Sequence, residues 1–479
     1  MKKMGVFQQS EQSRINAFAL ILYIYNRSPA VGGIAMNARE GALKVLYEVE
    51  VDNAYSNIAL NKELKDKPYS AKDRGFMTEL VYGVLENLIM IDNVIEQFSS
   101  IKLKKINAYT LILLRLAIYQ ILYLDKIPPS AAVNESVNLS KIYCKRSSGF
   151  INGILRNMLR QKENIKIPDE KKDFVGYLSV TYSHPKWMIE EFLKFFDPVF
   201  TKELLKANNQ KPELNVRVNT LKISVEEAIK ALNNSGFDVV QNAFISEGLT
   251  IKGDKNLFEL EALKEGLIYI QDFGSMLIGK IVDPKENDFV IDVCSAPGGK
   301  TTHMAQLMNN KGNIIARDVY DHKLKLIEKN AKALGIKIIK TEKFDGKVLD
   351  KSLIEKADKV LVDAPCSGLG IIRRKPEIKY RKRPDDIKEI TSLQLKILKN
   401  ASMYVKPGGS LVYSTCTIDP RENAEVIDQF LKDSSEYQQV NIGEVYKNMI
   451  PGNHKDTIQL YPNIHHTDGF FISKLIKRV

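Results

Sequence analysis

Cysteine and histidine are scarce in this sequence, and neither is arranged in the way that metal sites or disulfide frameworks require. Its 479 residues include four cysteines that lie far apart, without a Cys-x-x-Cys pair, and six histidines without ligand spacing. We therefore expect no bound metal and no disulfide-stabilised fold. Free cysteines are typical of a reducing compartment, so the composition favours a cytoplasmic protein.

Long hydrophobic runs that could span a membrane are missing as well. The apolar segment at residues 17–25 is too short to cross a bilayer, which takes about 20 residues. It is similar to the core of a signal peptide, but residues 31–36 can be back-translated into a ribosome-binding site before a start codon. We therefore predict that translation begins at Met36 and that residues 1–35 are an extension or a mis-called start.

Acidic residues are outnumbered by basic ones, which leaves a net charge of +12 and a pI of about 9.1. This balance favours a polyanionic partner, although generically solvated lysines explain it equally well. Hydrophobic residues make up 44% of the chain and charged residues 27%, which is an ordinary globular composition. The length leaves room for several domains.

Residues 36–165 carry apolar side chains at helical spacing, which predicts an all-helical first domain. Residues 111–124 are apolar on nearly every side, so we expect a buried central helix that ends before Pro128. Basic residues gather towards the predicted loops and helix ends: Lys102, Lys104, Lys105, Lys141, Lys145, Arg146, Arg156 and Arg160. They form either an RNA-binding surface or an ordinary solvated one, and the sequence favours neither.

Residues 166–260 are predicted to hold a linker with a helix and then a small α+β domain. A strand at residues 214–218, a helix capped by Ser224 and a strand at residues 237–240 give this domain a β-α-β order. Arg217 and Asn219 lie near its first strand. They either contact RNA or support the next domain.

Residues 261–479 alternate short apolar strands with helices, which predicts a doubly wound, Rossmann-like parallel sheet with helices on both faces. The expected strands are residues 289–293, 313–316, 337–340, 359–362, 410–413 and 470–476. Ligands of such sheets bind at the carboxyl ends of the strands. The predicted fold class is therefore multidomain, with an all-α domain, a small α+β domain and an α/β domain.

A glycine-bearing turn at residues 294–301 follows the first of these strands and opens a helix. Asp318 and Asp345 follow the next two strands, where carboxylates can accept hydrogen bonds from ribose hydroxyls. Each aspartate could instead cap a neighbouring turn or helix. For Asp318 taken alone, capping of the following helix is the better explanation. Together the three positions form the usual frame of an adenosine site. The turn departs from Gly-x-Gly-x-x-Gly, so a nicotinamide cofactor is disfavoured.

Two further strands end close to cysteines. Cys366 lies in Asp-Ala-Pro-Cys-Ser-Gly and Cys416 in Ser-Thr-Cys-Thr. Because the carboxyl ends of parallel strands share an edge, we expect both thiols to face one pocket. A small buried apolar role explains one cysteine there but not two. Cys294 is expected to have that role, with only its backbone lining the cofactor, and Cys144 is expected to be inert.

These motifs resemble those of the Sun (Fmu) family of RNA cytosine-5 methyltransferases. The segments that carry the resemblance are residues 295–301, 363–368, 414–417 and 468–471, in the family's order. Ser295 and Thr417 stand where alanine and serine are common in the family. Neither change removes a group that the chemistry needs.

The N-terminal region extends the resemblance. Residues 73–76, 79–85 and 150–156 look like a NusB-type RNA-binding domain, which is fused to bacterial members that act on 16S ribosomal RNA. The implied partner is therefore 16S ribosomal RNA, free or in an early assembly particle. The alternatives are another RNA such as tRNA, a DNA cytosine-5 methyltransferase, and a non-catalytic RNA-binding assembly factor.

The resemblance implies a covalent mechanism with S-adenosyl-L-methionine as cofactor. Cys416 is then the nucleophile that adds to carbon 6 of cytosine, and Cys366 assists release of the adduct. Asp363 is expected between cofactor and base, and Lys300 is expected to favour the reactive thiolate. A plain ion pair between these two residues is compatible with both roles. The Pro-Cys sequence at Cys366 also resembles the nucleophile of DNA cytosine-5 methyltransferases, so the reverse assignment of the thiols stays open.

The same resemblance implies a cofactor site built from the glycine turn and the strand-end aspartates. Its expected residues are Cys294, Ser295, Ala296, Pro297, Gly298, Gly299, Lys300, Asp318, Asp345 and Asp363. The backbone N–H groups of Ala296, Gly298 and Gly299 should receive the methionine carboxylate, because helix N-termini favour anions.

The basic segment at residues 373–383 is predicted to contact RNA, with Tyr380 stacking on a base. A solvated charged loop is the plain alternative. The target cytidine has to leave its stack to reach the pocket, so we expect it to be flipped out or unpaired.

Overall fold

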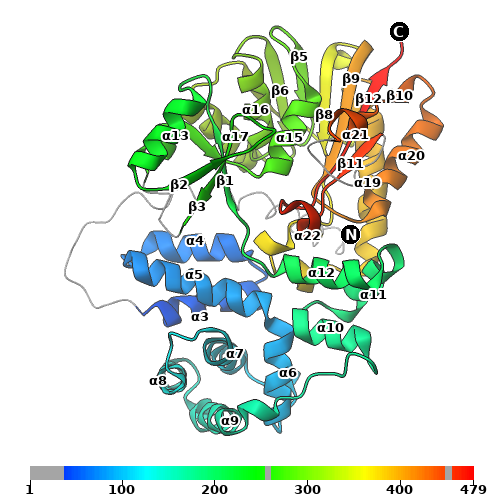
Figure 1. The fold of residues 1–479 in the computed structure, drawn as a ribbon. Coiled ribbons are helices and arrows are strands. Elements are labelled where there is room, and N and C mark those ends of the chain that lie inside the picture. Colours follow the sequence, from blue (N-terminus) through cyan, green and yellow to red (C-terminus); the bar gives the residue numbers. More distant parts are fainter. Residues whose placement is uncertain (1–36, 254–259, 448–455) are drawn as a thin grey trace. The chain divides into compact units, whose positions relative to one another are not determined.

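The computed structural model describes residues 37–253, 260–447 and 456–479 (Figure 1). The predicted start at Met36 and the predicted extension before it lie outside the described residues. Contacts divide the chain into two compact units. We call them the helical unit, which runs to Asn209 and also includes residues Lys375–Arg381, and the sheet unit, which comprises Gln210–Arg374 and Lys382–Val479.

The helical unit begins with the predicted all-helical region. Its helices are α3 (Ala38–Glu50), α4 (Ser56–Asp66), α5 (Ala71–Glu86), α6 (Leu88–Phe98), α7 (Ala108–Tyr123), α8 (Pro129–Tyr143) and α9 (Ser148–Arg160), followed by α10 (Phe174–Tyr182), α11 (Lys186–Phe195) and α12 (Pro198–Asn208). The side chain of Asn107 caps α7, and Pro129 is the first residue of α8. Proline suits that position because it has no N–H to leave unpaired.

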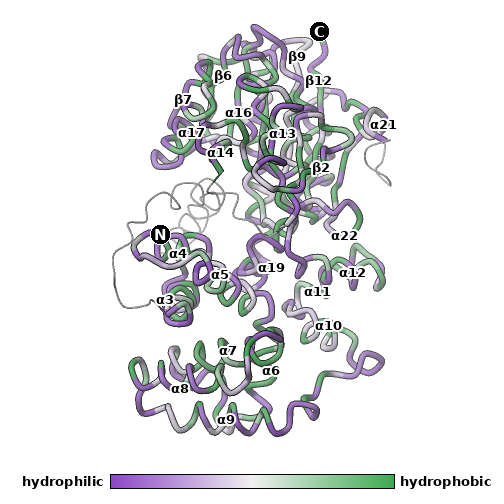
Figure 2. Tube along the Cα trace, turned by 60° about the vertical axis from the view of Figure 1, so that its left-hand side comes forward, coloured by the Kyte–Doolittle hydropathy of each residue, from purple (hydrophilic) through white to green (hydrophobic). Residues whose placement is uncertain are grey.

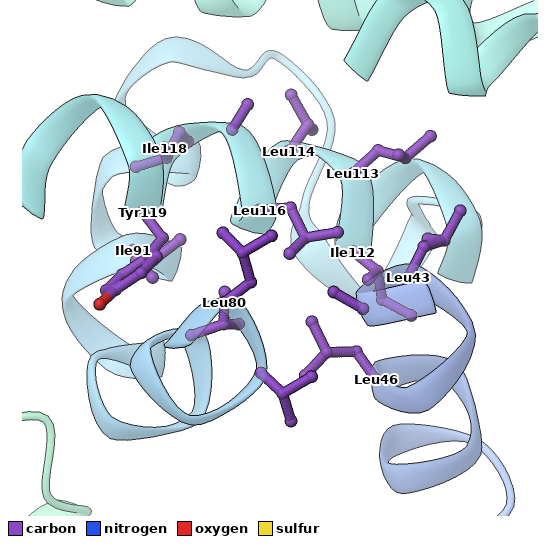
Figure 3. Close-up of a cluster of buried hydrophobic side chains, with 14 of the residues drawn as sticks. Leu43, Leu46, Leu80, Ile91, Ile112, Leu113, Leu114, Leu116, Ile118 and Tyr119 are labelled. Atoms are coloured by element: carbon purple, nitrogen blue, oxygen red, sulfur yellow. The ribbon is translucent and has the colours of Figure 1, made fainter. Parts of the chain in front are cut away.

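Helix α7 is the buried centre of the helical unit, as predicted. Hydrophobic residues, green in Figure 2, make up most of its length, and Arg115 and Gln120 interrupt them. Ile112 and Leu116 point towards Leu80 of α5 and towards Leu43 and Leu46 of α3 (Figure 3). All these side chains are at most 1% exposed, so their apolar burial helps to hold α3, α5 and α7 together.

The basic segment after Cys366 belongs in part to the helical unit. The carboxylate of Glu377 accepts hydrogen bonds from the backbone N–H and the hydroxyl of Ser56, at 3.2 and 2.9 Å. Lys379 is fully buried and donates to the backbone oxygen of Glu86 at 2.8 Å. Burial lowers the pKa of the Lys379 ammonium to about 7, with only partial compensation from the carboxylate of Glu86.

The prediction that residues 373–383 form a phosphate-contacting loop with a stacking aromatic is therefore wrong for much of the segment. Arg373, Lys375 and Lys379 are buried. The Tyr380 hydroxyl donates to the backbone oxygen of Leu85 at 2.8 Å, so its ring is held among helix ends. Sequence pattern shows that a segment is charged, but it does not show where that segment docks.

The sheet unit opens with the predicted small α+β layer. Its elements are β1 (Leu214–Val218), α13 (Val225–Asn234), β2 (Asp238–Gln241), β3 (Gly248–Lys252) and β4 (Ile268–Ile270). The strands form an antiparallel sheet in the order β2-β3-β1-β4. Ser224 and Glu227 form the capping box that starts α13.

A second, eight-stranded sheet follows in the order β10-β12-β9-β8-β5-β6-β7, with β11 beside β12. Its strands are β5 (Phe289–Asp292), β6 (Asn313–Asp318), β7 (Ile339–Lys343), β8 (Ala357–Asp363), β9 (Val405–Thr415), β10 (Tyr437–Gln439), β11 (Thr457–Gln459) and β12 (Phe471–Lys477). The helices among them are α15 (Phe273–Val282), α16 (Gly299–Leu307), α17 (Asp321–Leu334), α19 (Pro384–Ser402) and α20 (Ala424–Asp433).

The predicted parallel sheet is correct for β5 to β9 and wrong for the last strand. Strands β5, β6, β7, β8 and β9 are parallel to their neighbours, whereas β12 runs antiparallel to β9. A strand pattern gives the position of an element but not its direction. The consequence is that β12 starts, at Phe471, opposite Thr415 at the carboxyl end of β9.

Apolar strands place the carboxyl ends of β5, β8 and β9 side by side. Val290, Val360 and Leu411 are fully buried, as expected of strands covered on both faces. Within the described part of the chain, no helix has the combined length and hydrophobicity that crossing a membrane requires.

Candidate active site

The two thiols predicted to share a pocket lie in contact. The sulfur atoms of Cys366 and Cys416 are 3.1 Å apart, and the backbone N–H of Cys416 points at the Cys366 sulfur at 3.3 Å. Strands β8 and β9 create this arrangement, because they pair as far as Asp363 and Ser414. The segments that carry the two cysteines both begin directly after this pair, at the same edge of the sheet. The paired strand ends therefore bring together two cysteines that lie 50 residues apart.

Glycines let a third loop approach the two thiols. The backbone N–H of Gly370 donates to the carbonyl oxygen of Cys416 at 3.0 Å, and that of Gly469 donates to Gly370 at 2.8 Å. A Cβ atom on Gly370 would lie 2.1 Å from the oxygen of Gly469, so a larger side chain would force the loops apart. The Asp-Gly-Phe-Phe motif at residues 468–471 thus packs backbone to backbone against the cysteine loops.

Lys300 and Asp363 form an ion pair beside this centre. The Lys300 ammonium lies 2.6 Å from one carboxylate oxygen of Asp363, and the hydroxyl of Ser414 donates to the other at 2.9 Å. Burial by itself lowers the pKa of Lys300, but the attraction of Asp363 outweighs it and the net pKa is raised. The ammonium also lies 5.3 Å from the ring centre of Phe470. Lys300 is therefore a fixed positive charge at neutral pH.

Arg373 and Arg374 are bound to the Asp468 motif. Asp468 accepts a hydrogen bond from each arginine, and the Arg373 contact measures 2.7 Å. Arg374 also donates to Asp272, the N-cap residue of α15, at 3.1 Å. Burial, together with Asp468, raises the pKa of the Asp272 carboxyl. These ion pairs brace the loop after Cys366 against the Asp468 motif.

The glycine turn forms the predicted loop between β5 and α16. Gly298 has a φ of +97°, which favours glycine, and its N–H closes a turn onto Ser295 at 2.8 Å. The first turn of α16 leaves its backbone N–H groups pointing out of the helix. The guanidinium of Arg217, fully buried in β1, donates to the carbonyl oxygen of Gly299 at 2.9 Å and so fixes this turn from behind.

Hydrogen bonds and burial hold the remaining residues of the turn in place. The Ser295 hydroxyl donates to the carbonyl oxygen of Arg317 at 2.9 Å, and Asn330 donates to that of Pro297 at the same distance. Ala296 is buried. Cys294 is partly buried and packs against the core of the sheet unit.

The strand-end aspartates differ from one another. Asp318 is 6% exposed, accepts a hydrogen bond from the backbone N–H of Tyr320 at 3.1 Å, and has its pKa raised by burial. Asp345 lies just beyond β7 and caps a local turn through the N–H of Lys347 at 2.9 Å. Strands β6 and β7 pair as far as Asp318 and Lys343, so the two aspartates lie at the same sheet edge.

Two buried carboxyl groups at the site were not predicted. Asp292 ends β5, and one of its oxygens has no hydrogen-bond partner among the described residues, while the other accepts from Thr301 at 2.7 Å. Burial raises the pKa of Asp292 to about 7. An acidic residue inside the apolar run 289–293 is a signal that could have identified it.

The second is Glu422, which contacts both cysteine loops. One oxygen accepts from the backbone N–H of Ser367 at 2.8 Å and from the side-chain amide of Gln394 at 3.0 Å. The other accepts from the hydroxyl of Thr417 at 3.2 Å. Burial raises the pKa of the Glu422 carboxyl to about 6. Nothing in its local sequence distinguishes it from a surface glutamate.

Three family models match consecutive parts of the chain. The model described as "16S rRNA methyltransferase RsmB/F" matches residues 279–476, the NusB family matches residues 36–160, and the "RsmF/B-like, ferredoxin-like domain" matches residues 184–257. Together they account for the sheet with the thiol pair, the α3–α9 region and the small α+β layer.

Whole-chain comparisons agree with these matches. The "Probable ribosomal RNA small subunit methyltransferase B" of Bacillus subtilis (strain 168) is 36% identical, over 92% of this chain and 99% of its own length. The crystal structure of PH0851 is 31% identical, with a TM-score of 0.78, and covers 93% of this chain and 100% of its own. NSun6 from Pyrococcus horikoshii, solved with SFG, is 26% identical, with a TM-score of 0.56, and covers 61% of this chain and 98% of its own.

S-adenosylmethionine is the cofactor of this methyltransferase fold, and the site fits it. The unpartnered oxygen of Asp292 is an acceptor for a cationic amino group, and the first-turn N–H groups of α16 suit a carboxylate. Asp318 retains lone pairs for ribose hydroxyls beside them. Within the described ranges, no group of three or more histidines, cysteines or carboxylates is placed to hold a metal ion.

Proposed function

This chain belongs to the RsmB/F family of 16S rRNA methyltransferases, and from that premise we propose that it methylates carbon 5 of a cytidine in 16S ribosomal RNA through an adduct on Cys416. The observation that carries the proposal is the contact between the two thiols at the ends of β8 and β9. A reaction with an addition step and an elimination step can use one thiol in each.

The proposed chemistry begins with the Cys416 thiolate. Carbon 5 of cytosine is a weak nucleophile, and addition of the thiolate to carbon 6 turns it into an enamine carbon. Bound S-adenosylmethionine supplies an electrophilic methyl group on its sulfonium centre. After carbon 5 has taken up the methyl group, loss of its proton restores the double bond and breaks the bond between carbon 6 and the Cys416 sulfur. Cys366, in contact with that sulfur, assists this release.

Lys300 and Asp363 are proposed to prepare the site for these steps. The Lys300 ammonium places a positive charge near the sulfur atoms, which favours a thiolate over a thiol. Asp363 retains acceptor capacity towards the cytosine amino edge or the amino group of the methionine, because Lys300 and Ser414 leave lone pairs free on its carboxylate. The reverse assignment, with Cys366 as the nucleophile, remains the alternative.

The helical unit is proposed to bind the RNA. All of the basic residues that gather near its loops and helix ends are exposed: Lys102, Lys104, Lys105, Lys141, Lys145, Arg146, Arg156 and Arg160. Exposed basic side chains suit phosphate contacts, which should make binding fall as salt rises. The reaction is proposed to occur in the cytoplasm, where both thiols stay reduced.

Deletion of residues 36–161 is not a clean test of RNA binding, because it would remove the backbone oxygens of Glu86 and Leu85, to which Lys379 and Tyr380 donate. Substitution of the adjacent exposed residues Lys145 and Arg146 by alanine leaves the helices intact. We expect weaker RNA binding, a shallower salt dependence and unchanged affinity for S-adenosylmethionine. RNA affinity that is unchanged, or independent of salt, would count against this role.

The substrate assignment is tested by incubating the protein with labelled S-adenosylmethionine and either 16S ribosomal RNA, tRNA or duplex DNA. We expect 5-methylcytidine in the 16S RNA alone. Bisulfite sequencing of ribosomal RNA from a strain that lacks the protein should then show one newly unprotected cytidine. Labelled methyl groups in tRNA or DNA would instead support a tRNA or DNA methyltransferase. Tight RNA binding without methyl transfer would support a non-catalytic assembly factor.

A further inference from the structure

A single buried carboxylate connects the two thiol loops. Glu422 is 0% exposed, and its two oxygens bind the residue that follows Cys366 and the residue that follows Cys416. We propose that Glu422 is a positioning residue that sets the separation of the two sulfur atoms without touching substrate or cofactor. The catalytic purpose of this positioning rests on the proposed function, whereas the effect of Glu422 on the separation of the sulfur atoms does not.

The hydrogen bonds around Glu422 form a directed chain. An ionised carboxylate only accepts hydrogen bonds, so the Thr417 hydroxyl has to donate to it. The Thr417 oxygen then becomes the acceptor for the hydroxyl of Ser367, which lies 2.8 Å away. One carboxylate thereby fixes a backbone N–H and two hydroxyls. These groups belong to the residues directly after the two cysteines.

Helix α19 completes the brace. Gln394 donates through one side-chain amide to the Glu422 carboxylate at 3.0 Å and to the carbonyl oxygen of Pro365 at 2.9 Å. Pro365 directly precedes Cys366. The Cys366 loop is therefore held on both sides of the thiol, once through Ser367 and once through Pro365.

The cost of this arrangement argues for a positioning role. No cation among the described residues forms an ion pair with Glu422, and its donors are neutral groups. A buried carboxylate with only neutral donors is expensive to keep, and a fold that needed only packing could fill the space with an apolar side chain. An apolar side chain could not hold the three hydrogen-bond donors, from Ser367, Gln394 and Thr417, in fixed positions.

The experiment compares Glu422→Gln with Glu422→Ala. Glutamine is isosteric: its oxygen can accept from Ser367 and Gln394, and its amide can donate to Thr417, whose hydroxyl reverses direction. Alanine removes all three bonds. Glu247→Ala is the matched control, because Glu247 is a buried carboxylate in the same unit whose partners, His303 and Lys280, belong to neither thiol loop.

The first measurement is thiol cross-linking by diamide, which takes up two electrons and two protons as the sulfur atoms of Cys366 and Cys416 join. Peptide mass mapping identifies the bond. We expect wild type, Glu422→Gln and Glu247→Ala to cross-link at similar rates, and Glu422→Ala to be about tenfold slower, since several hydrogen bonds are lost. A wild-type rate in Glu422→Ala, or slow cross-linking in Glu422→Gln, would overturn the proposal.

The second measurement is steady-state methylation. Glu422→Ala should lower kcat by about ten- to a hundredfold while the KM for S-adenosylmethionine changes by less than about threefold, and Glu422→Gln should restore kcat. If neither the wild-type protein nor any variant methylates RNA, the proposed function fails. The cross-linking rates would still show whether Glu422 sets the separation of the two sulfur atoms. Equal losses in kcat for Glu422→Ala and Glu247→Ala would indicate a merely structural role and overturn the inference.

Should Glu422→Ala fail to fold, Thr417→Val provides the same test with an isosteric side chain. It removes the hydrogen bonds of the Thr417 hydroxyl with Glu422 and Ser367, and also the one that it accepts from the backbone N–H of Asp419. We expect it to cross-link several-fold more slowly than wild type. A wild-type cross-linking rate in this variant would also overturn the proposal.

Discussion

In the helical unit, aliphatic side chains from α3, α5 and α7 form the core, and the basic residues proposed to contact RNA are exposed. In the sheet unit, by contrast, charged side chains are buried near the strand ends. Asp292, Glu422 and Asp468 are all at most 2% exposed. Buried charge costs stability unless it is paired or hydrogen-bonded. The difference indicates that the sheet unit gives up stability at the positions where geometry matters for chemistry.

The helical unit has its own buried ionic group, and the contrast with the sheet unit is informative. Arg115 of α7 binds Glu50 and Asp92, at the edge of the core. Burial on its own would lower the pKa of Arg115, but the two carboxylates more than compensate and the pKa is raised. Here the three charged side chains pair with one another, although one oxygen of Glu50, like one oxygen of Asp292, has no hydrogen-bond partner among the described residues. Asp292 therefore differs from the triad by its place at the end of β5, beside the glycine turn that opens α16, and by the lack of a paired cation in the described part of the chain.

The largest effect should come from the sheet unit, at the proposed nucleophile. Cys416→Ser removes the thiolate and should lower kcat on the order of 10⁴-fold or more, because a serine hydroxyl is a far weaker nucleophile. Its free energy of unfolding should change little, since the sulfur is only partly buried. Methyl transfer assays with chemical unfolding check both values. If Cys416→Ser retained turnover, the contrast between a catalytic sheet unit and a structural helical core would be contradicted.

The opposite pattern is expected for the helical core. Leu116→Ala leaves a cavity at a side chain that is 1% exposed, so the free energy of unfolding should fall by about 2–5 kcal/mol. The affinity of the folded protein for S-adenosylmethionine should stay the same. Ile142→Ala, at an apolar side chain that is 72% exposed, is the control and should change stability by about 0.5 kcal/mol or less.

An intermediate effect is expected where the sheet unit pairs its charges. Lys300→Met leaves the Asp363 carboxylate without its cation, and kcat/KM should fall about a hundredfold. The surface pair of Lys406 and Asp358 offers the control, because Lys406 is 47% exposed and exposed ion pairs contribute little. Lys406→Met should retain activity within about twofold. Equal losses in the two variants would show that charge pairing in the sheet unit is only structural.

The smallest effect concerns pH. The folded-state pKa of Asp292 is raised to about 7 by burial, so the carboxylate is mostly ionised at pH 8 and mostly protonated at pH 6. Binding of the cationic amino group of S-adenosylmethionine should therefore weaken by up to about tenfold between pH 8 and pH 6. Calorimetric titration across this range checks the slope. Asp292→Asn should bind more weakly throughout and lose the pH dependence.

The sequence predicted the thiol pair because strand ends can be located from short apolar runs and parallel strands end at one edge. It predicted the glycine turn and Asp318 by the same argument. Asp345 occupies the expected edge, but its contacts are local. These predictions needed only the identity of the strands and their order along the chain.

The sequence did not predict features that depend on long-range docking. Residues Lys375–Arg381 are charged, which predicts a surface loop, yet Glu377 and Lys379 form hydrogen bonds with helix ends about 300 residues away. The antiparallel direction of β12 and the burial of Glu422 likewise depend on contacts made after the strands assemble. Local periodicity carries no information about such contacts.

The central claim is that the two thiols perform two different steps, and trapping of the RNA adduct tests it most directly. Cys366→Ser and Cys416→Ser are each incubated with 16S ribosomal RNA and S-adenosylmethionine and run on a denaturing gel. We predict that Cys366→Ser forms the adduct but releases it slowly, so that it shows a slower-migrating band, and that Cys416→Ser and the double variant show none. A band from Cys416→Ser and none from Cys366→Ser would contradict the account and reverse the roles of the two thiols.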